Sequence, residues 1–235
     1  MTGSTQGIGR AIAGALVAEG ARVIINGRRD AAVRETVAAL AKSGEAHGIA
    51  ADMATAAGAQ TRPRRARRGS APVDILVNNV GFFEVRKFAE IPDREWTDMF
   101  ELNVMSGVRL SRALLPGMLE RDWGRIVFIA SEQSVKPNPD MAHYAMSKTA
   151  PGLRSREASP ISTKGTRVTV NSVLVAPTVV GGRRKSFLAK DRTGRRARRW
   201  TRCAPPTSDD RPFIAAAALG DAGGNRARRV VVPLL

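Results

Sequence analysis

The opening stretch of the chain constrains its fold more than any other feature. A turn that contains three glycines, Thr2-Gly3-Ser4-Thr5-Gln6-Gly7-Ile8-Gly9, runs straight into an amphipathic apolar segment that ends at Gly20. Glycines let the backbone of such a turn approach a bound group closely, and the first turn of a helix has free N–H groups that favour an anion. We therefore predict a helix over residues 10–20 with an anion site at its start.

Polar residues follow two further apolar runs at the point where each run ends. Val73-Asp74-Ile75-Leu76-Val77 leads into Asn78-Asn79-Val80-Gly81, and residues 126–130 lead into Ser131. Strand-like runs alternate with helix-like segments, and a chain of 235 residues can bury one sizeable core. This pattern favours an α/β fold with a doubly wound parallel sheet. Ligands bind at the carboxyl ends of such strands, so we expect these polar groups to converge on one site.

Tyr144 and Lys148 are the residues best suited to proton transfer. Side chains four residues apart lie on the same face of a helix, so the ammonium can stand beside the phenol. A free tyrosine titrates at about pH 10, roughly three units above neutrality, which corresponds to about 4 kcal/mol. A unit charge about 4 Å away supplies that much at an effective dielectric of about 20, and far too little in bulk water. The pair is therefore expected to act in a dry cleft, and a plain exposed helix face is the alternative.

Together these motifs resemble the classical short-chain dehydrogenase/reductase family. The family motif TGxxxGxG is matched by Thr2, Gly3, Gly7 and Gly9, the motif NNxG by Asn78, Asn79 and Gly81, and the motif YxxxK by Tyr144 and Lys148. The resemblance covers residues 2 to 149 and 168–177, and it implies a Rossmann-like dinucleotide-binding and catalytic domain over residues 1–180. It also implies hydride transfer between a nicotinamide cofactor and a small alcohol or ketone, with 3-oxoacyl thioesters among the candidate substrates.

The resemblance assigns a role to each matching residue. Ser131 would bind the substrate oxygen, Tyr144 would be its general acid and base, and Lys148 would bind both the tyrosine and the nicotinamide ribose. Asn103 would hold a water that links Lys148 to solvent. A local helix cap or kink is the alternative for Asn103, and a bond to its own backbone is the alternative for Ser131. The expected cofactor-binding residues are Gly3, Ser4, Gln6, Gly7, Ile8, Gly9, Arg28, Asp52, Asn79, Gly81, Tyr144, Lys148 and Pro177.

The charge that follows residues 22–25 indicates which cofactor is bound. This apolar run leads into Asn26-Gly27-Arg28-Arg29, and no acid occurs before Asp30. An NAD site places an acid at this strand end to bind the ribose 2′-hydroxyl, whereas an arginine accommodates a 2′-phosphate. A charge-assisted contact of that kind contributes about 1.5–3 kcal/mol, so we predict NADP in preference to NAD. Asp52 resembles the acid that contacts adenine, and a helix cap is the alternative for it.

Cysteine, histidine and hydropathy patterns exclude several classes of protein. The single cysteine, Cys203, rules out an internal disulfide framework. His47 and His143 are too few and too far apart for a metal site, so no metal is expected. No apolar run approaches the roughly 20 residues of a membrane span, and we find no signal peptide. A cytoplasmic enzyme without a membrane partner is therefore predicted, and the resemblance implies a homo-oligomer.

The net charge of +17 is concentrated in two segments. Residues 61–69 carry five arginines and no acid, and residues 183–229 carry fourteen Lys and Arg against four Asp. Such segments could neutralise phosphates, so a basic protein that binds nucleic acid or another anion is the alternative function. Aromatic residues that could stack on bases are sparse, and a solvated basic run explains the composition more simply. Nucleic-acid binding is therefore disfavoured.

Three stretches lack the periodicity of either helix or strand. Residues 56–71, 150–164 and 181–235 have irregular patterns, the first and last rich in Arg and Ala, and Pro151 breaks the helix that carries Tyr144. Only Met1 precedes the glycine turn, so we expect the sheet to lack the family's first strand and the basic segment 181–235 to be irregular. We hypothesise that these stretches are out-of-frame translations of a GC-rich gene. A family member with impaired catalysis is therefore a further alternative.

Overall fold

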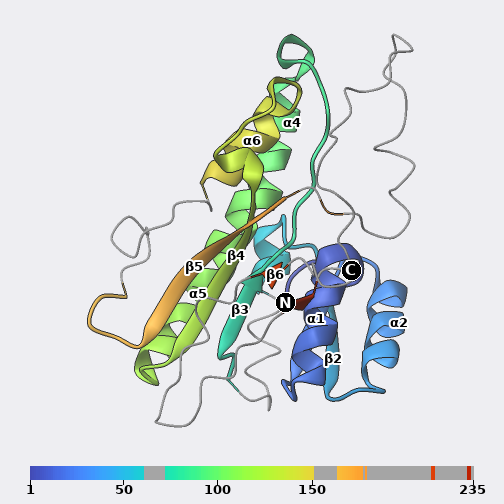
Figure 1. Ribbon diagram of the computed structural model, residues 1–235, viewed down its shortest axis with the longest axis vertical. Coiled ribbons are helices and arrows are strands. Elements are labelled where there is room, and N and C mark those ends of the chain that lie inside the picture. The colour runs from blue at the N-terminus through green and yellow to red at the C-terminus, as the bar shows by residue number, and fades with distance from the viewer. Residues whose placement is uncertain (61–71, 151–162, 177, 179–212, 215–231, 234–235) are drawn as a thin grey trace.

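The computed structural model describes residues 1–60, 72–150, 163–176, 178, 213–214 and 232–233. Parallel strands form its centre, and helices cover both faces (Figure 1). Val77 and Ile129 pack with helix α1 (Gly7–Ala18) in one apolar cluster. Leu76 precedes Val77 by one residue, and Ile126 precedes Ile129 by three. Both therefore point to the opposite face, where they pack with helix α5 (Ser106–Glu120) in a second cluster. Because successive side chains of a strand point to opposite faces, this division confirms the predicted doubly wound α/β fold.

The strands follow the apolar runs of the sequence. β1 (Val23–Gly27) pairs with β2 (Ala46–Ala50), and β4 (Gly124–Ser131) lies between β3 (Ile75–Asn78) and β5 (Val168–Val175). All of these pairings are parallel. β6 (Phe213–Ile214) and β7 (Val232–Pro233) form a separate antiparallel pair, with β7 beside α1. The carboxyl ends of β1, β3 and β4 therefore lie at one edge, as a shared site requires.

The first four residues, Met1–Ser4, join the two parallel sheets, and we call them the seam. The Met1 amino group donates to Ile24 O of β1 at 3.2 Å, and Thr2 N donates to Val77 O of β3 at 3.0 Å. Ser4 N returns to β1 and donates to Asn26 O at 2.9 Å. No strand precedes α1 in the described part of the chain, and the seam takes the position of a central strand between β1 and β3.

The helices are short and end where the sequence indicates. α1 stops at Ala18, and Gly20, with φ of 85°, turns the chain toward β1. Further helices are α2 (Asp30–Leu40), η1 (Phe88–Glu90), α4 (Asp93–Phe100), the π-helix η2 (Glu101–Met105), η3 (Glu132–Ser134), η4 (Pro139–Met141) and α6 (Ala142–Thr149). α6 packs against α4 and ends two residues before Pro151, which lies outside the described residues.

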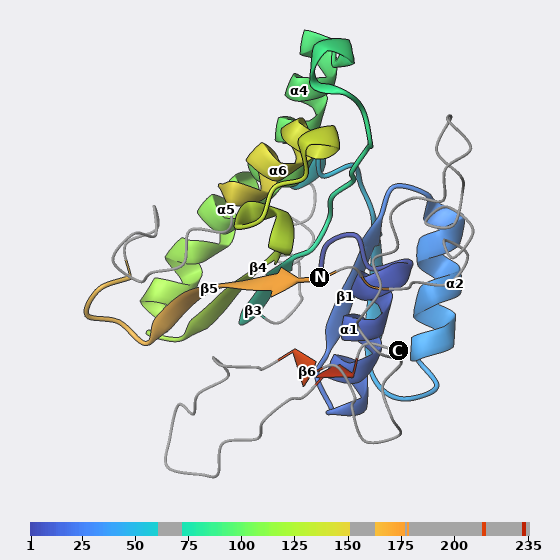
Figure 2. The same ribbon diagram turned by 45° about the horizontal axis from the view of Figure 1, so that its top comes forward.

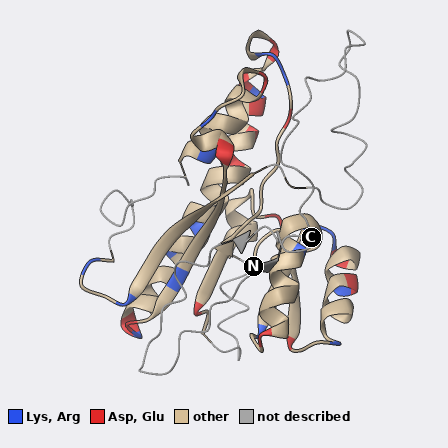
Figure 3. Ribbon diagram, viewed as in Figure 1, with Lys and Arg blue, Asp and Glu red and all other residues tan. Residues whose placement is uncertain are grey.

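The irregular stretches fall largely outside the described residues. Residues 56–60 are helical, whereas 61–71, 151–162 and all of 181–235 except β6 and β7 are not described. The out-of-frame hypothesis and the domain boundary at residue 180 therefore stay predictions. Over the described elements, basic and acidic positions are interspersed (Figure 3). Within that part of the chain, no helix is long and apolar enough to cross a membrane.

Candidate active site and cofactor site

The glycine turn brings the open end of α1 to the carboxyl edge of the strands. Gly3 and Gly7 have φ of 57° and 58°, a left-handed conformation that glycine adopts without strain. α1 begins at Gly7 with no side-chain cap and no acid in its first turn. The first N–H groups of a helix have no partner within it, so this end is open to an anion, and the anion site itself stays a prediction. At the turn, Gln6 is exposed and Ile8 is partly buried.

Gly9 is where the helix comes closest to the turn. A β-carbon on Gly9 would collide with Gly3 O and with Asn79 Nδ2. The Asn79 side chain is itself committed to the turn, because Nδ2 donates to Thr2 O and to Gly3 O, each at 3.0 Å. We call the glycine turn of residues 2–9 the cradle. Asn79, predicted to contact the cofactor, holds the cradle from the side of β3.

Two polar residues that the sequence analysis did not assign to the site hold the same cradle. Thr2 Oγ1 accepts hydrogen bonds from Asn79 N at 2.9 Å and Val80 N at 3.0 Å, and Thr2 is 0% exposed. Asn26 Nδ2 donates to Ile49 O at 3.2 Å and Ala51 O at 3.1 Å, while its Oδ1 accepts from Gly3 N at 3.4 Å. A polar residue at the end of an apolar run is the signal that could have found Asn26.

The side chain of Ser4, a predicted cofactor contact, is hydrogen-bonded to the backbone of Met1 and Asn26. Its hydroxyl donates to Met1 O at 3.0 Å and accepts from Asn26 N at 2.9 Å, and the residue is fully buried. Thr2 therefore binds the seam to the β3 side, and Ser4 binds it to β1. The shape of the cradle depends on both.

Ser131 and Tyr144 meet at the carboxyl end of β4. Burial raises the pKa of Tyr144 above its ordinary value of 10.0, and a side-chain hydrogen bond with Ser131 opposes that rise. Ser131 Oγ also accepts from Gln133 N at 3.3 Å at the start of η3. The backbone bond given as the alternative for Ser131 is therefore present, and its role at the substrate oxygen stays a prediction.

Lys148 lies beneath the tyrosine. Its Nζ donates to Ile129 O at 2.9 Å and lies 5.9 Å from the centroid of the Tyr144 ring. Burial lowers the pKa of Lys148 from 10.5 to about 8. The prediction that the ammonium lowers the pKa of Tyr144 is wrong for this structure, because burial dominates and Ser131 is the group that opposes it.

Asn103 lies in the π-helix η2, a local distortion of the kind named as the alternative, and its expected role in holding a water stays a prediction. Its Oδ1 accepts from Phe82 N at 3.0 Å, and its Nδ2 donates to Phe82 O at 3.0 Å and to Ser147 Oγ at 2.9 Å. A β-carbon on Gly81 would lie 2.9 Å from Asn103 Oδ1 and 3.3 Å from Lys148 Nζ. The predicted residues Gly81, Asn103 and Lys148 therefore come together.

The remaining predicted cofactor residues lie around the ends of β1 and β2. Arg28 is exposed and makes no ion pair with another described residue, because Asp30 pairs with Arg34 at 2.5 Å. Asp52 Oδ1 accepts from Ala54 N at 3.0 Å, so the carboxylate caps a local turn and keeps a second oxygen for other contacts. Pro177 lies outside the described residues. In the described part, no group of three or more His, Cys, Asp or Glu could hold a metal ion.

Aromatic side chains surround the helix that carries Tyr144. The Phe83 ring packs against the Tyr144 ring at 5.7 Å between centroids, and the Trp96 ring packs against His143 at 5.8 Å. His143 is buried where α6 packs against α4, and burial lowers its pKa. Both of its ring nitrogens lack a hydrogen-bond partner among the described residues.

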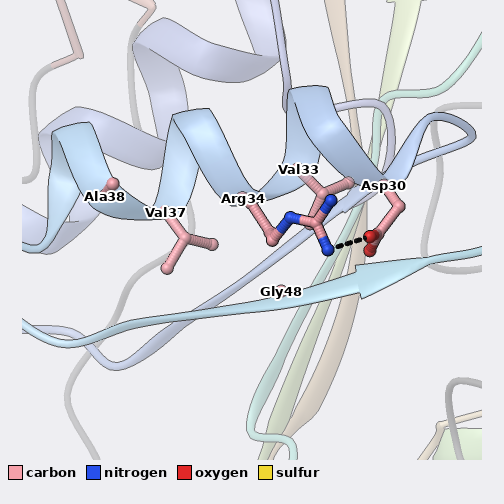
Figure 4. Close-up of a pocket in the computed structure, with 6 residues that line it drawn as sticks. All are labelled: Asp30, Val33, Arg34, Val37, Ala38 and Gly48. Carbon is pink, nitrogen blue, oxygen red and sulfur yellow. Dashed lines mark ion pairs between the residues drawn. The ribbon is translucent and has the colours of Figure 1, made fainter.

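A surface pocket lies away from these groups, between α2 and β2. Its volume is about 270 Å³, and it is lined by Asp30, Val33, Arg34, Val37, Ala38 and Gly48 (Figure 4). The Asp30–Arg34 ion pair lies at one end, and valines form the wall that faces Gly48. The pocket contains none of the predicted catalytic residues, so we do not assign it to the reaction.

Comparison with known proteins agrees with this geometry. The family model "short chain dehydrogenase" matches residues 1–191. The chain belongs to the short-chain dehydrogenase/reductase family. It is 50% identical over 182 residues to the uncharacterized oxidoreductase YvrD of Bacillus subtilis (strain 168), which covers 77% of this chain and 68% of the relative. This member of the family is therefore an NAD(P)-dependent dehydrogenase or reductase with a Rossmann fold.

Two other relatives show the range of substrates within the family. D-beta-hydroxybutyrate dehydrogenase of Cupriavidus necator is 35% identical over 174 residues, which is 74% of this chain and 67% of the relative. The structure of L-sorbose reductase from Gluconobacter frateurii, complexed with NADPH and L-sorbose, is 31% identical with a TM-score of 0.74. That likeness covers 83% of this chain and 75% of the reductase.

Proposed function

We propose that the chain is an NADP(H)-dependent oxidoreductase that interconverts a small alcohol and the corresponding ketone, with Tyr144 as general acid and base. The observation that carries this proposal is that the Tyr144 ring centroid lies 5.9 Å from Nζ of the buried Lys148, while Ser131 interacts with the phenol at the end of β4. A hydroxyl and a phenol side by side form a site for one substrate oxygen. Ser131 binds that oxygen, and Tyr144 exchanges a proton with it.

The residues present fit a nicotinamide dinucleotide. The open N-terminus of α1 suits a pyrophosphate, and the left-handed Gly3 and Gly7 leave room for it. When bound, the cofactor supplies or accepts the hydride. The chain's own groups, Asn79 and Gly81 after β3 and Lys148 on α6, lie along the path from this turn to Tyr144.

The raised pKa of Tyr144 determines which protonation state the phenol has at neutral pH. At neutral pH the phenol holds its proton, so it is ready to protonate a carbonyl oxygen as hydride reaches the carbon. Alcohol oxidation needs the phenolate and therefore higher pH. Lys148, with a pKa of about 8, is largely protonated at neutral pH and balances the charge when the phenol gives up its proton.

The preference for NADP is supported by charge at the end of β1. Arg28 is exposed and has no acidic partner among the described residues, so its guanidinium is free to bind a 2′-phosphate. Asp52 retains one carboxylate oxygen for adenine. The structures of two family neighbours were determined with NADPH or NADP, which agrees with this choice.

We further infer that the chain assembles with copies of itself through α4 and α6. These helices pack together, and each leaves a large apolar side chain in solvent, with Phe100 49% and Met146 65% exposed. Light scattering of the purified protein should give at least twice the chain mass, and Met146→Lys should lower that mass. A monomeric wild type would refute this part of the proposal.

The function is tested by Tyr144→Phe in NADPH oxidation assays with a panel of small ketones. Loss of the phenol proton should lower kcat by about 10²- to 10⁴-fold. NADPH binding, followed by nicotinamide fluorescence, should be little changed, because Tyr144 contributes only part of the cofactor site. Wild-type turnover that survives the substitution would show that another group donates the proton.

A further inference from the structure

A buried serine connects the elements that carry the proposed catalytic residues. Ser147 lies on α6 next to Lys148 and is 3% exposed. Its hydroxyl donates to Tyr144 O at 2.8 Å and accepts from Asn103 Nδ2 at 2.9 Å. The bond crosses from α6 to the π-helix, so a single side chain links the Tyr144 helix to Asn103.

The Asn103 amide has no spare donor once Ser147 is in place. One of its two amide protons goes to Phe82 O and the other to Ser147 Oγ, while its Oδ1 accepts from Phe82 N. Phe82 follows Gly81 directly, so this amide joins the loop after β3 to α6. Without the serine oxygen, a buried N–H would lose its partner and α6 would lose this link to the loop.

The link matters because of what stands on either side of Gly81. A β-carbon on this glycine would lie 2.9 Å from Asn103 Oδ1 and 3.3 Å from Lys148 Nζ. The amide oxygen and the ammonium therefore face the same small space. An oxygen acceptor that faces an ammonium favours its charged form. A displacement of α6 relative to η2 would change the distance between Asn103 Oδ1 and Lys148 Nζ.

We propose that Ser147 is a positioning residue that, through its bond to Asn103, holds Asn103 Oδ1 close to Lys148 Nζ in the space beside Gly81. The inference rests on the proposed function, since it concerns the group that balances the charge on Tyr144. It assigns Ser147 no contact with substrate or cofactor. Its action is on geometry, and through geometry on the proton held by Lys148.

The test compares Ser147→Ala with Ser147→Thr, which keeps a hydroxyl. In Ser147→Ala, kcat should fall about tenfold to a hundredfold, the range expected when a catalytic group is misplaced. The alkaline limb of the kcat profile should move to lower pH, because an Asn103 Oδ1 displaced from beside Lys148 Nζ stabilises the ammonium less. The KM for NADPH should change little, and Ser147→Thr should restore both kcat and the pH profile.

Ser106→Ala is the matched control. Ser106 is also a buried serine next to the π-helix, but its hydroxyl donates to Leu102 O of its own turn, at 2.5 Å. It should leave the alkaline limb in place. A uniform loss of activity in Ser147→Ala without a pH shift, or the same shift in Ser106→Ala, would overturn the proposal.

A double-mutant cycle with Asn103→Ala separates this inference from the proposed function. If Ser147 acts through Asn103, the double variant should be no slower than Asn103→Ala alone, and additive losses would overturn the inference. If the wild type reduces no carbonyl substrate, the proposed function fails. The same cycle measured by thermal unfolding then decides whether the two residues are coupled, because independent residues give additive shifts in the midpoint.

Discussion

The two parallel sheets, β1–β2 and β3–β4–β5, lie side by side (Figure 2), and they carry different parts of the proposed site. In the catalytic half, β4 and β5 pair over eight residues each, and Ser131, Tyr144 and Lys148 are held by contacts within that half. In the cofactor half, β1 and β2 pair over five residues each. The glycine turn between them belongs to neither sheet.

We infer that the proposed cofactor site depends more on the seam than Ser131 and Tyr144 do. Thr2 and Ser4 supply the polar contacts across the seam, and Met1 lies in the apolar cluster with Val23 and Val77. A cradle formed where two sheets are joined by four residues is sensitive to small changes there. The Ser131–Tyr144 pair, built within one sheet, should tolerate the same changes.

Gly9→Ala should have the largest effect, and the effect should fall on NADPH binding. The new β-carbon collides with Gly3 O and Asn79 Nδ2, so the turn must open and NADPH binding should be lost at any attainable concentration. Gly14→Ala, in the same helix, meets only Leu40 Cδ2 at 3.5 Å and should bind normally. Equal NADPH affinity in the two variants, measured by fluorescence titration, would contradict this role of the turn.

Thr2→Val tests the seam itself. The change leaves the buried N–H groups of Asn79 and Val80 without their acceptor, so the free energy of unfolding should fall by about 2–4 kcal/mol. Thr36→Val removes a buried hydroxyl that only donates to carbonyls, and should cost about 1 kcal/mol. Urea unfolding measures both, and a seam variant as stable as the control would show that the halves do not depend on Thr2.

Lys148→Met tests whether the buried ammonium of Lys148 lowers the free energy of unfolding. The pKa of Lys148 is about 8 when folded against 10.5 otherwise, so between these values the unfolded chain binds the extra proton and stability rises with pH. Below pH 8 both states are protonated, and the folded protein bears the full cost of the buried ammonium, about 3 kcal/mol.

The methionine variant should therefore be more stable than the wild type by about 3 kcal/mol at pH 7, and it should lose the rise in stability toward pH 10. Lys136→Met, at an exposed position, serves as the control and should change neither quantity. Unfolding by urea at the two pH values decides the matter. A Lys148→Met variant less stable than the wild type at pH 7 would contradict the pKa assigned to this lysine.

The smallest effect is the titration of the phenol. Tyr144 is the only tyrosine in the chain, so tyrosinate absorbance reports on it alone. Because burial raises its pKa, the absorbance should rise only above about pH 10. Ser131→Ala should move the midpoint higher still, since the lost hydrogen bond opposed the rise. A midpoint near neutrality would restore the sequence-based expectation that Lys148 lowers this pKa.

Much of the fold follows from sequence because its signals are local. The apolar runs predict β1, β3 and β4, glycine spacing predicts the turn before α1, and the four-residue spacing brings Tyr144 and Lys148 onto α6. Ser147 and Asn26 were missed because their partners, Asn103 and Ala51, are distant in sequence. The extra residue of a π-helix has no periodic signature, so η2 could not be predicted. The pKa of Tyr144 depends on burial, which spacing alone does not reveal.

We expect the chain to form an NADP(H) site where the seam joins the two parallel sheets, and a direct binding measurement tests this claim best. The purified protein should be titrated with NADPH and, separately, NADH, with nicotinamide fluorescence as the signal and about 0.5 M salt to screen attraction to the basic segments. Saturable binding that is tighter for NADPH is the predicted result. No saturable binding of either cofactor would contradict the claim, and tighter binding of NADH would contradict the role of Arg28.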